Sequence, residues 1–156
     1  MDDLPAALRA SSLFTDFTAV GVKILASVTK HKTLPGGTPI FLEGTQSDAL
    51  YIVHAGEVVI RMRESDEIEV DVAHLGNGDH FGELALLGAG PRLASAYAVG
   101  DCEILEIARR DFARLQRKKP QACLKLLMVI VARFGQRLSE SRDAWQGVLA
   151  EAARGQ

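Results

Sequence analysis

Hydrophobic residues recur at helical spacing from Leu4 to Lys30. The spacing of three and four residues places them on one face of a helix. Polar residues in the same stretch are suitable helix N-caps. The apolar positions are Leu13, Phe14, Phe17, Val20, Ile24, Leu25 and Val28, and the candidate caps are Ser11, Ser12, Thr15 and Asp16. The pattern predicts one or two short helices.

The pattern changes to short strands separated by glycine turns between Lys32 and about Ala108. Residues 58–62 and 68–72 flank a polar stretch at 63–67, as expected of a hairpin. Ile68, Val70 and Val72 alternate with acidic residues, which predicts a half-buried strand. Residues 104–107 form the last of the predicted strands. Many short strands with regular turns favour an antiparallel roll or barrel over a parallel α/β sheet.

The chain is predicted to be helical again from Arg110. Asp111 begins a short helix, the Lys119-Pro120 pair ends it, and a second helical run follows. This run carries an a/d heptad pattern over roughly four heptads. Its members are Leu124, Leu127, Val131, Phe134, Leu138, Ser141, Trp145, Val148 and Ala152. Such a helix either packs on its own domain or forms a dimer, and Ser141 is the weak point of the pattern.

Composition limits the classes of protein to consider. The 156 residues are 47% hydrophobic, which suits one domain with its own core. A net charge of −2 gives no sign of nucleic-acid binding. Neither a signal peptide nor an apolar run of about 18 residues is present, and the longest run is Leu126–Ala132. We therefore expect a cytoplasmic protein without a membrane segment.

The sequence offers no recognisable catalytic or metal site. Cys102 and Cys123 lie far apart without nearby partners, whereas a zinc site needs about four ligands. The histidines are His31, His54, His74 and His80. No carboxylate pair or nucleophile accompanies them at a recognisable spacing. We expect neither catalysis nor a bound metal.

Residues 81–95, FGELALLGAGPRLAS, form the most informative segment. Gly82 allows a tight turn, and the free amides at the start of the following helix favour an anion. Arg92 follows a glycine-rich loop and can hold two phosphate oxygens. Glu83 would be repelled by a phosphate but can accept a hydrogen bond from a sugar hydroxyl. The segment therefore suits a ribose phosphate.

This segment resembles the phosphate-binding cassette of the cyclic nucleotide-binding domain family, which includes kinase regulatory subunits and catabolite activator proteins. Residues 34–44, 50–58 and 75–79 resemble other parts of that domain, including a strand pair with a tight turn at 50–58. The resemblance implies that Glu83 accepts the ribose 2′-hydroxyl and that Arg92 pairs with the cyclic phosphate. It also implies that the backbone of Gly82, Leu84, Ala85 and Leu93 lies at the phosphate.

The resemblance suggests further contacts with less specific signals. Ser95 either adds a hydroxyl or faces a neighbouring strand. Ile60, Val72 and Leu75 match positions that line the base, and Arg133 matches a ligand-proximal arginine or is a solvated helix charge. Leucine at position 93 favours cyclic AMP, with cyclic GMP still possible. Trp145 is either a lid over the base or part of a helix pair.

The combined prediction is a mainly β protein. It consists of a helical segment at 1–31, an antiparallel, jelly-roll-like β-roll at 32–110, and C-terminal helices at 111–156 that include one long helix. The expected function is cyclic-nucleotide sensing that regulates an unidentified effector, with a homodimer formed through Leu124–Ala152. The alternative is the sensory fragment of a helix-turn-helix transcription regulator. The chain ends at Gln156 without such a motif.

Overall fold

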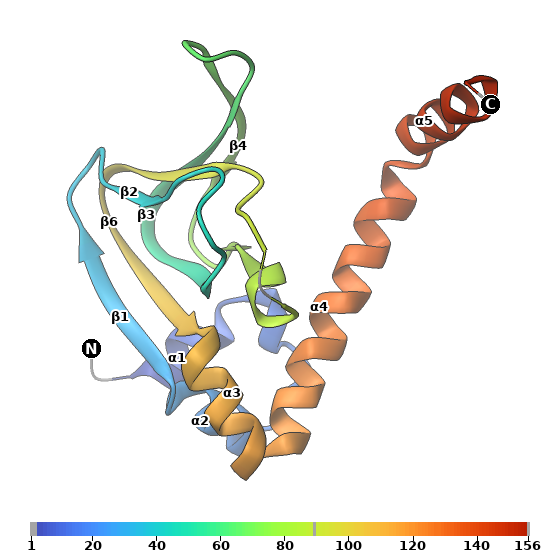
Figure 1. Ribbon diagram of the computed structural model, residues 1–156. Helices are drawn as coiled ribbons and strands as arrows, with labels where there is room; N and C mark the ends of the chain where they lie inside the picture. The colour runs from blue at the N-terminus through green and yellow to red at the C-terminus, as the bar shows by residue number, and fades with distance from the viewer. Residues whose placement is uncertain (1–2, 89, 156) are drawn as a thin grey trace.

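The computed structural model describes residues 3–88 and 90–155, in which an antiparallel sheet lies against helices from both ends of the chain (Figure 1). The helices are α1 (Leu4–Arg9), α2 (Ala19–Ala26), α3 (Arg109–Lys118), α4 (Pro120–Glu140) and α5 (Arg142–Arg154), with 3-10 helices η1 (Ser12–Phe14) and η2 (Glu83–Leu86). The strands are β1 (Thr29–Leu34), β2 (Pro39–Phe41), β3 (Ala49–Arg63), β4 (Glu69–Leu75), β5 (His80–Phe81) and β6 (Ser95–Ala108). The predicted antiparallel β-roll with N-terminal helices and a long C-terminal helix is confirmed.

The sheet has the order β1-β6-β3-β4, with β2 paired to β6 and β5 paired to β3. The two longest strands, β3 and β6, form its centre. Both β4 and β5 pair with β3, at its two ends, so the loop between them stays close to the sheet. β1 begins at Thr29, so the predicted boundary at residue 31 falls inside a strand.

The predicted strand pair with a tight turn within residues 50–58 is wrong, because β3 is one strand that bends. The bend is at Gly56, which has a φ of 87°. A Cβ there would lie 2.7 Å from the Cβ of Cys102 and 2.8 Å from the carbonyl oxygen of Asp101. Register shifts on both sides of Ala55 mark an irregularity in the pairing with β6. The glycine therefore curves a strand instead of reversing it.

The half-buried strand predicted from Ile68, Val70 and Val72 is also wrong. Their exposed fractions are 53%, 38% and 49%. β4 is the last strand of the sheet order, and the hairpin that it forms with β3 extends beyond the rest of the roll (Figure 1). A hairpin that projects in this way has no second layer to cover either face.

Two clusters of buried residues stabilise the fold. One joins the N-terminal helices, α3 and the first part of α4 to the sheet; its largest fully buried members include Leu8, Phe14, Leu50, Ile107, Phe112 and Leu126. The other fills the roll and includes Tyr51, Val53, Val58, Phe81, Ala96 and Ile104. The second cluster ends at Phe41, Ile60 and Leu75, where the sheet borders a cavity.

The heptad pattern from Leu124 to Ala152 does not form one continuous helix. Ser141 leaves the helical conformation, with φ −95° and ψ 18°, and divides the run into α4 and α5. α4 buries Cys123, Leu126 and Ile130 against the first cluster. The side chains of Trp145 and Val148 lie outside the described residues. Among the described residues, no helix is both long enough and apolar enough to cross a membrane.

Candidate functional site

The segment singled out in the sequence leaves the sheet at Gly82. β5 ends at Phe81, Gly82 has a φ of 72°, and η2 begins at Glu83. A Cβ at position 82 would lie 2.6 Å from Nη1 of Arg92 and 3.1 Å from the carbonyl oxygen of Ala49. Glycine is therefore required both for the left-handed backbone and for the approach of the guanidinium.

We expect Gly82→Ala to destabilise the protein by about 1–3 kcal/mol, because alanine at positive φ is strained and its methyl group displaces Arg92. Chemical denaturation measures the change in the free energy of unfolding. Gly88→Ala is the matched control, since among the described residues no atom beyond its chain neighbours lies within 4 Å of a Cβ there and its φ is not positive. Equal stability of the two variants would contradict this account of Gly82.

Arg92 is buried, and its guanidinium joins three parts of the fold. Nη2 donates to the carbonyl oxygen of Ala49 at 2.9 Å and to the Asp48 carboxylate at 3.3 Å, and Nη1 donates to the carbonyl oxygen of Gly82 at 3.4 Å. The guanidinium carbon lies 3.9 Å from the centroid of the Phe41 ring. Its buried Nε has no hydrogen-bond partner among the described residues. Arg92 is thus held in place while its Nε–H is still unused.

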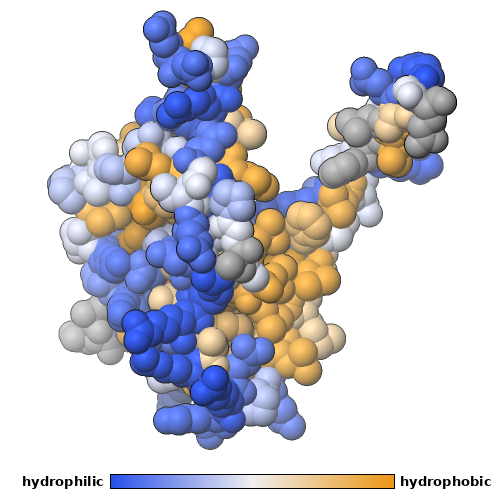
Figure 2. Space-filling model, viewed as in Figure 1, coloured by the Kyte–Doolittle hydropathy of each residue, from blue (hydrophilic) through white to orange (hydrophobic). Residues whose placement is uncertain are grey.

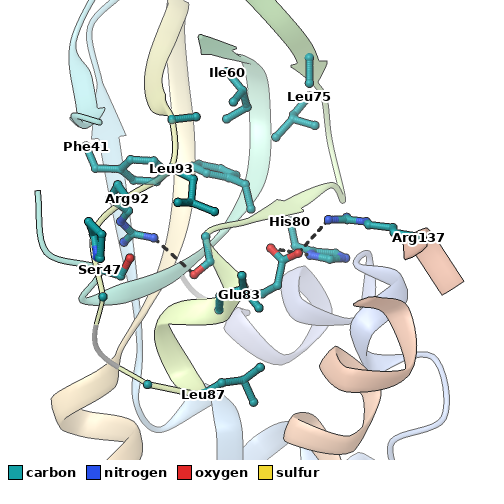
Figure 3. A pocket seen from close by; sticks show the side chains of 18 residues that line it. Phe41, Ser47, Ile60, Leu75, His80, Glu83, Leu87, Arg92, Leu93 and Arg137 are labelled. Carbon is teal, nitrogen blue, oxygen red and sulfur yellow. Dashed lines mark hydrogen bonds and ion pairs between the residues drawn. The ribbon is translucent and has the colours of Figure 1, made fainter. Parts of the chain in front are cut away.

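Glu83 lies across the site from Arg92 and contacts two basic side chains (Figure 3). Its Oε1 accepts a hydrogen bond from Nη1 of Arg137 on α4 at 2.9 Å, and its Oε2 lies 3.5 Å from Nδ1 of His80. Burial raises the pKa of Glu83, but His80, the residue's own backbone amide and Arg137 outweigh that effect. The pKa therefore lies below its usual value of 4.5. Glu83 is a paired carboxylate and stays charged at neutral pH.

A cavity of about 700 Å³ connects these groups. Charged and apolar side chains line different parts of it, with Ile60 and Leu75 away from Glu83 (Figure 3). Its lining residues are Phe41, Ser47, Ile60, Ala73, Leu75, His80, Phe81, Gly82, Glu83, Leu84, Leu87, Gly88, Gly90, Pro91, Arg92, Leu93, Ala94 and Arg137. An anionic group can reach Arg92 while an apolar ring system contacts the sheet.

Residues 31–119, more than half of the chain, match the family described as "Cyclic nucleotide-binding domain". The chain belongs to this family. It is 35% identical over 127 residues to the cyclic AMP receptor protein of Thermus thermophilus, covering 81% of this chain and 59% of that protein. It is 37% identical over 93 residues to the cAMP-dependent protein kinase type II regulatory subunit of Drosophila melanogaster, covering 60% of this chain and 24% of the subunit.

Solved structures agree with this assignment. The catabolite activator protein of Thermus thermophilus superposes with a TM-score of 0.76 at 34% identity, over 90% of this chain and 63% of that one. The regulatory domain of Toxoplasma gondii PKA, solved with cAMP, has a TM-score of 0.69 at 25% identity, over 83% of this chain and 49% of that one. The chain spans less than two thirds of the length of these relatives.

Seven of the residues predicted for a cyclic nucleotide-binding site line the same cavity. They are Gly82, Glu83, Leu84, Arg92, Leu93, Ile60 and Leu75. Leu93 is 70% exposed and lies at the rim. Most of them lie within the segment 81–95, and their closeness along the chain was enough to predict that they belong to one site.

Four predicted residues do not line the cavity. The amide of Ala85 donates to the carbonyl oxygen of Gly82 at 3.2 Å. The hydroxyl of Ser95 accepts from the amide of Glu43 at 2.8 Å, so it faces the neighbouring segment. Nη2 of Arg133 donates to the carbonyl oxygen of Ser12 at 3.1 Å. Val72 is 49% exposed at the register shift of β4.

The sequence did not reveal several residues that the cavity contains. Ala73 takes the place predicted for Val72, because the register shift between Ile60 and Arg61 pairs Ile60 with Ala73. Arg137, one helical turn after Arg133, is the arginine of α4 that reaches the site. His80 precedes the cassette and was visible as a histidine, but no sequence signal connected it to Glu83.

Proposed function

We propose that this cyclic nucleotide-binding domain takes cyclic AMP into the cavity between Arg92 and the apolar face of β3 and β4. The observation that carries the proposal is the Nε–H of Arg92, a buried donor without a partner among the described residues, on a side chain that lines the cavity. A buried donor left unpaired costs about 1–3 kcal/mol, which a phosphate oxygen would recover. The names of relatives, including the cyclic AMP receptor protein, support the choice of ligand.

Glu83 is proposed as the acceptor for the ribose 2′-hydroxyl. Each carboxylate oxygen has two lone pairs, so Oε1 can accept from the ribose while it keeps its bond to Arg137. Arg137 also neutralises the carboxylate and so reduces its repulsion of the phosphate. The apolar side chains of Ile60 and Leu75 would contact the adenine ring.

Calorimetric titration with cyclic AMP, cyclic GMP and 2′-deoxy cyclic AMP tests both proposals. We expect binding of cyclic AMP at micromolar concentration or below, with weaker binding of cyclic GMP. Glu83→Gln should weaken cyclic AMP binding by about tenfold, which corresponds to one hydrogen bond of about 1.4 kcal/mol to a charged group. The same variant should change the affinity for the 2′-deoxy analogue much less, because that ligand lacks the hydroxyl. Equal losses for both ligands would remove Glu83 from the ribose role.

A homodimer formed through α4 is the proposed route to an output. Figure 2 shows a hydrophobic patch over the part of the surface that α4 occupies. It consists of exposed apolar side chains on one side of the helix: Leu124 (58%), Met128 (63%), Val131 (56%), Phe134 (45%) and Leu138 (37%). Gly135 lies within the same stripe, where its missing side chain permits close approach of a second helix. Cyclic AMP would then regulate an effector by changing the geometry of the pair.

The alternative proposal is that the domain senses cyclic AMP for a helix-turn-helix regulator. The observation in its favour is the likeness to the cyclic AMP receptor protein of Thermus thermophilus, of which this chain covers 59%. The sequence of the complete gene decides between the two proposals. A DNA-binding segment after Gln156 would establish the alternative. In both proposals the chain binds a nucleotide and performs no catalysis.

A further inference from the structure

His80 is buried next to Glu83, the group that we propose to receive the ribose. Its side chain is 7% exposed, and its strand partner on β3 is Ile52. Nδ1 lies 3.5 Å from Oε2 of Glu83, which is long for a hydrogen bond. That buried nitrogen has no hydrogen-bond partner among the described residues. An apolar residue would fill the position without leaving an unpaired nitrogen.

The charges around the cavity give His80 a role that an apolar residue could not have. The titratable side chains that line it are His80, Glu83, Arg92 and Arg137. Asp48 contacts Arg92 from outside the cavity. The two carboxylates balance the two arginines, so these groups have no net charge when His80 is neutral. Protonation of His80 leaves one positive charge, which matches the single negative charge of a cyclic phosphate.

We propose that His80 positions Glu83 for the ribose and that protonation of its ring links nucleotide affinity to pH. The proposal rests on the proposed function of the cavity. A protonated ring attracts the Glu83 carboxylate and the bound phosphate, so binding of the anion favours protonation. Thermodynamic linkage is reciprocal, so protonation of His80 must raise the affinity for the anionic nucleotide.

Other charged groups near His80 leave the direction of this effect unchanged. Arg137 on α4 opposes protonation, but it is already paired with Glu83 at 2.9 Å. The carboxylate of Asp79, the preceding residue, accepts from the amide of Gly76 at 2.9 Å. Histidine titrates between about pH 5 and 8 in proteins. Affinity for cyclic AMP should be highest at the acidic end of this range and fall as the pH rises.

Calorimetric titration of the full chain with cyclic AMP between pH 5.5 and 8.0 tests the inference. We expect the dissociation constant of the wild type to rise about three- to tenfold over this range, with net proton uptake on binding at the acidic end. Titrations in two buffers of different ionisation enthalpy measure that uptake. His80→Asn keeps an N–H donor near Nδ1 but cannot titrate, so its affinity should be nearly independent of pH.

His74→Asn is the matched control. His74 is a histidine of β4 whose side chain is 56% exposed, and it contacts Glu57 outside the cavity. This variant should keep the pH dependence of the wild type. A purely structural role of His80 predicts equal affinities for His80→Asn and His80→Leu. Positioning of Glu83 predicts that His80→Asn binds cyclic AMP more tightly than His80→Leu and that 2′-deoxy cyclic AMP does not distinguish them.

The outcomes separate this inference from the proposed function. Wild-type binding that is independent of pH, or an equal pH dependence in His80→Asn, overturns the inference and leaves the binding site intact. Absence of cyclic AMP binding by the wild type at every pH overturns the proposed function and the inference together.

Discussion

Arg92→Ala should weaken cyclic AMP binding by about 2–5 kcal/mol, or about 30- to 5,000-fold, as expected when one partner of a buried charge pair is removed. The effect should be large because the Arg92 side chain is only 3% exposed, whereas Arg137, the other arginine among the lining residues that the structure describes, is 59% exposed. Stacking on Phe41 holds the guanidinium in place before the ligand arrives. Isothermal calorimetry measures the loss, and unchanged affinity would refute the phosphate assignment.

Arg92→Ala also removes the hydrogen bonds to Ala49 and Gly82, so thermal unfolding must show that the variant is folded at the titration temperature. Arg92→Lys provides a second comparison. Lysine keeps the positive charge but cannot donate in several fixed directions or stack as a planar group. We expect its affinity to lie between those of the wild type and the alanine variant. If Arg92→Lys binds as tightly as the wild type, charge alone explains the contact and the geometric argument fails.

Phe134→Asp combined with Leu138→Asp should convert the chain to a monomer in light scattering. Both residues lie on the exposed apolar stripe of α4, and a dimer would have to bury two carboxylates in each copy without partners. Buried aromatic and apolar anchors provide most of the affinity of such an interface. The α4 dimer predicts a change from two copies to one at every practical protein concentration.

Ala132→Asp combined with Gln136→Asp is the matched control for the dimer. It adds the same charge at the same spacing to exposed positions of α4 that lie away from the stripe. This variant should remain a dimer. A wild-type chain that is monomeric at high concentration, both with and without cyclic AMP, would rule out α4 as the dimer element.

The parts of the site that follow one another along the chain could be predicted from sequence. Gly82, Glu83 and Arg92 belong to one segment whose residue types already suggest a turn, an acceptor and a phosphate ligand. Their proximity depends on a short loop and needs no knowledge of the tertiary structure. The fold class could be predicted for a similar reason, since glycine turns and short apolar runs report on each strand separately.

The contributions of residues from distant elements could not be predicted in the same way. Arg133 and Arg137 are one turn apart on an amphipathic helix, and only the docking of α4 on η1 and η2 decides which one reaches Glu83. Ala73 lines the cavity at the place predicted for Val72, because β4 contains a register shift. An alternating pattern of apolar residues does not reveal such a shift. The bend at Gly56 depends on its close contact with β6. In the sequence alone, a glycine within a bent strand looks the same as a glycine in a tight turn.

The position of Arg137 along α4 has a mechanical consequence. The last residue that α4 buries is Ile130, and Arg137 lies seven positions beyond it, which corresponds to about 10 Å at 1.5 Å per residue. The ion pair with Glu83 therefore acts beyond the part of α4 that buried side chains fix. A displacement of about 3 Å at Arg137 would bend this end of the helix axis by about 16°. A change at Glu83 would then change that angle, and in a pair of such helices the angle would set how α5 is presented beyond Ser141.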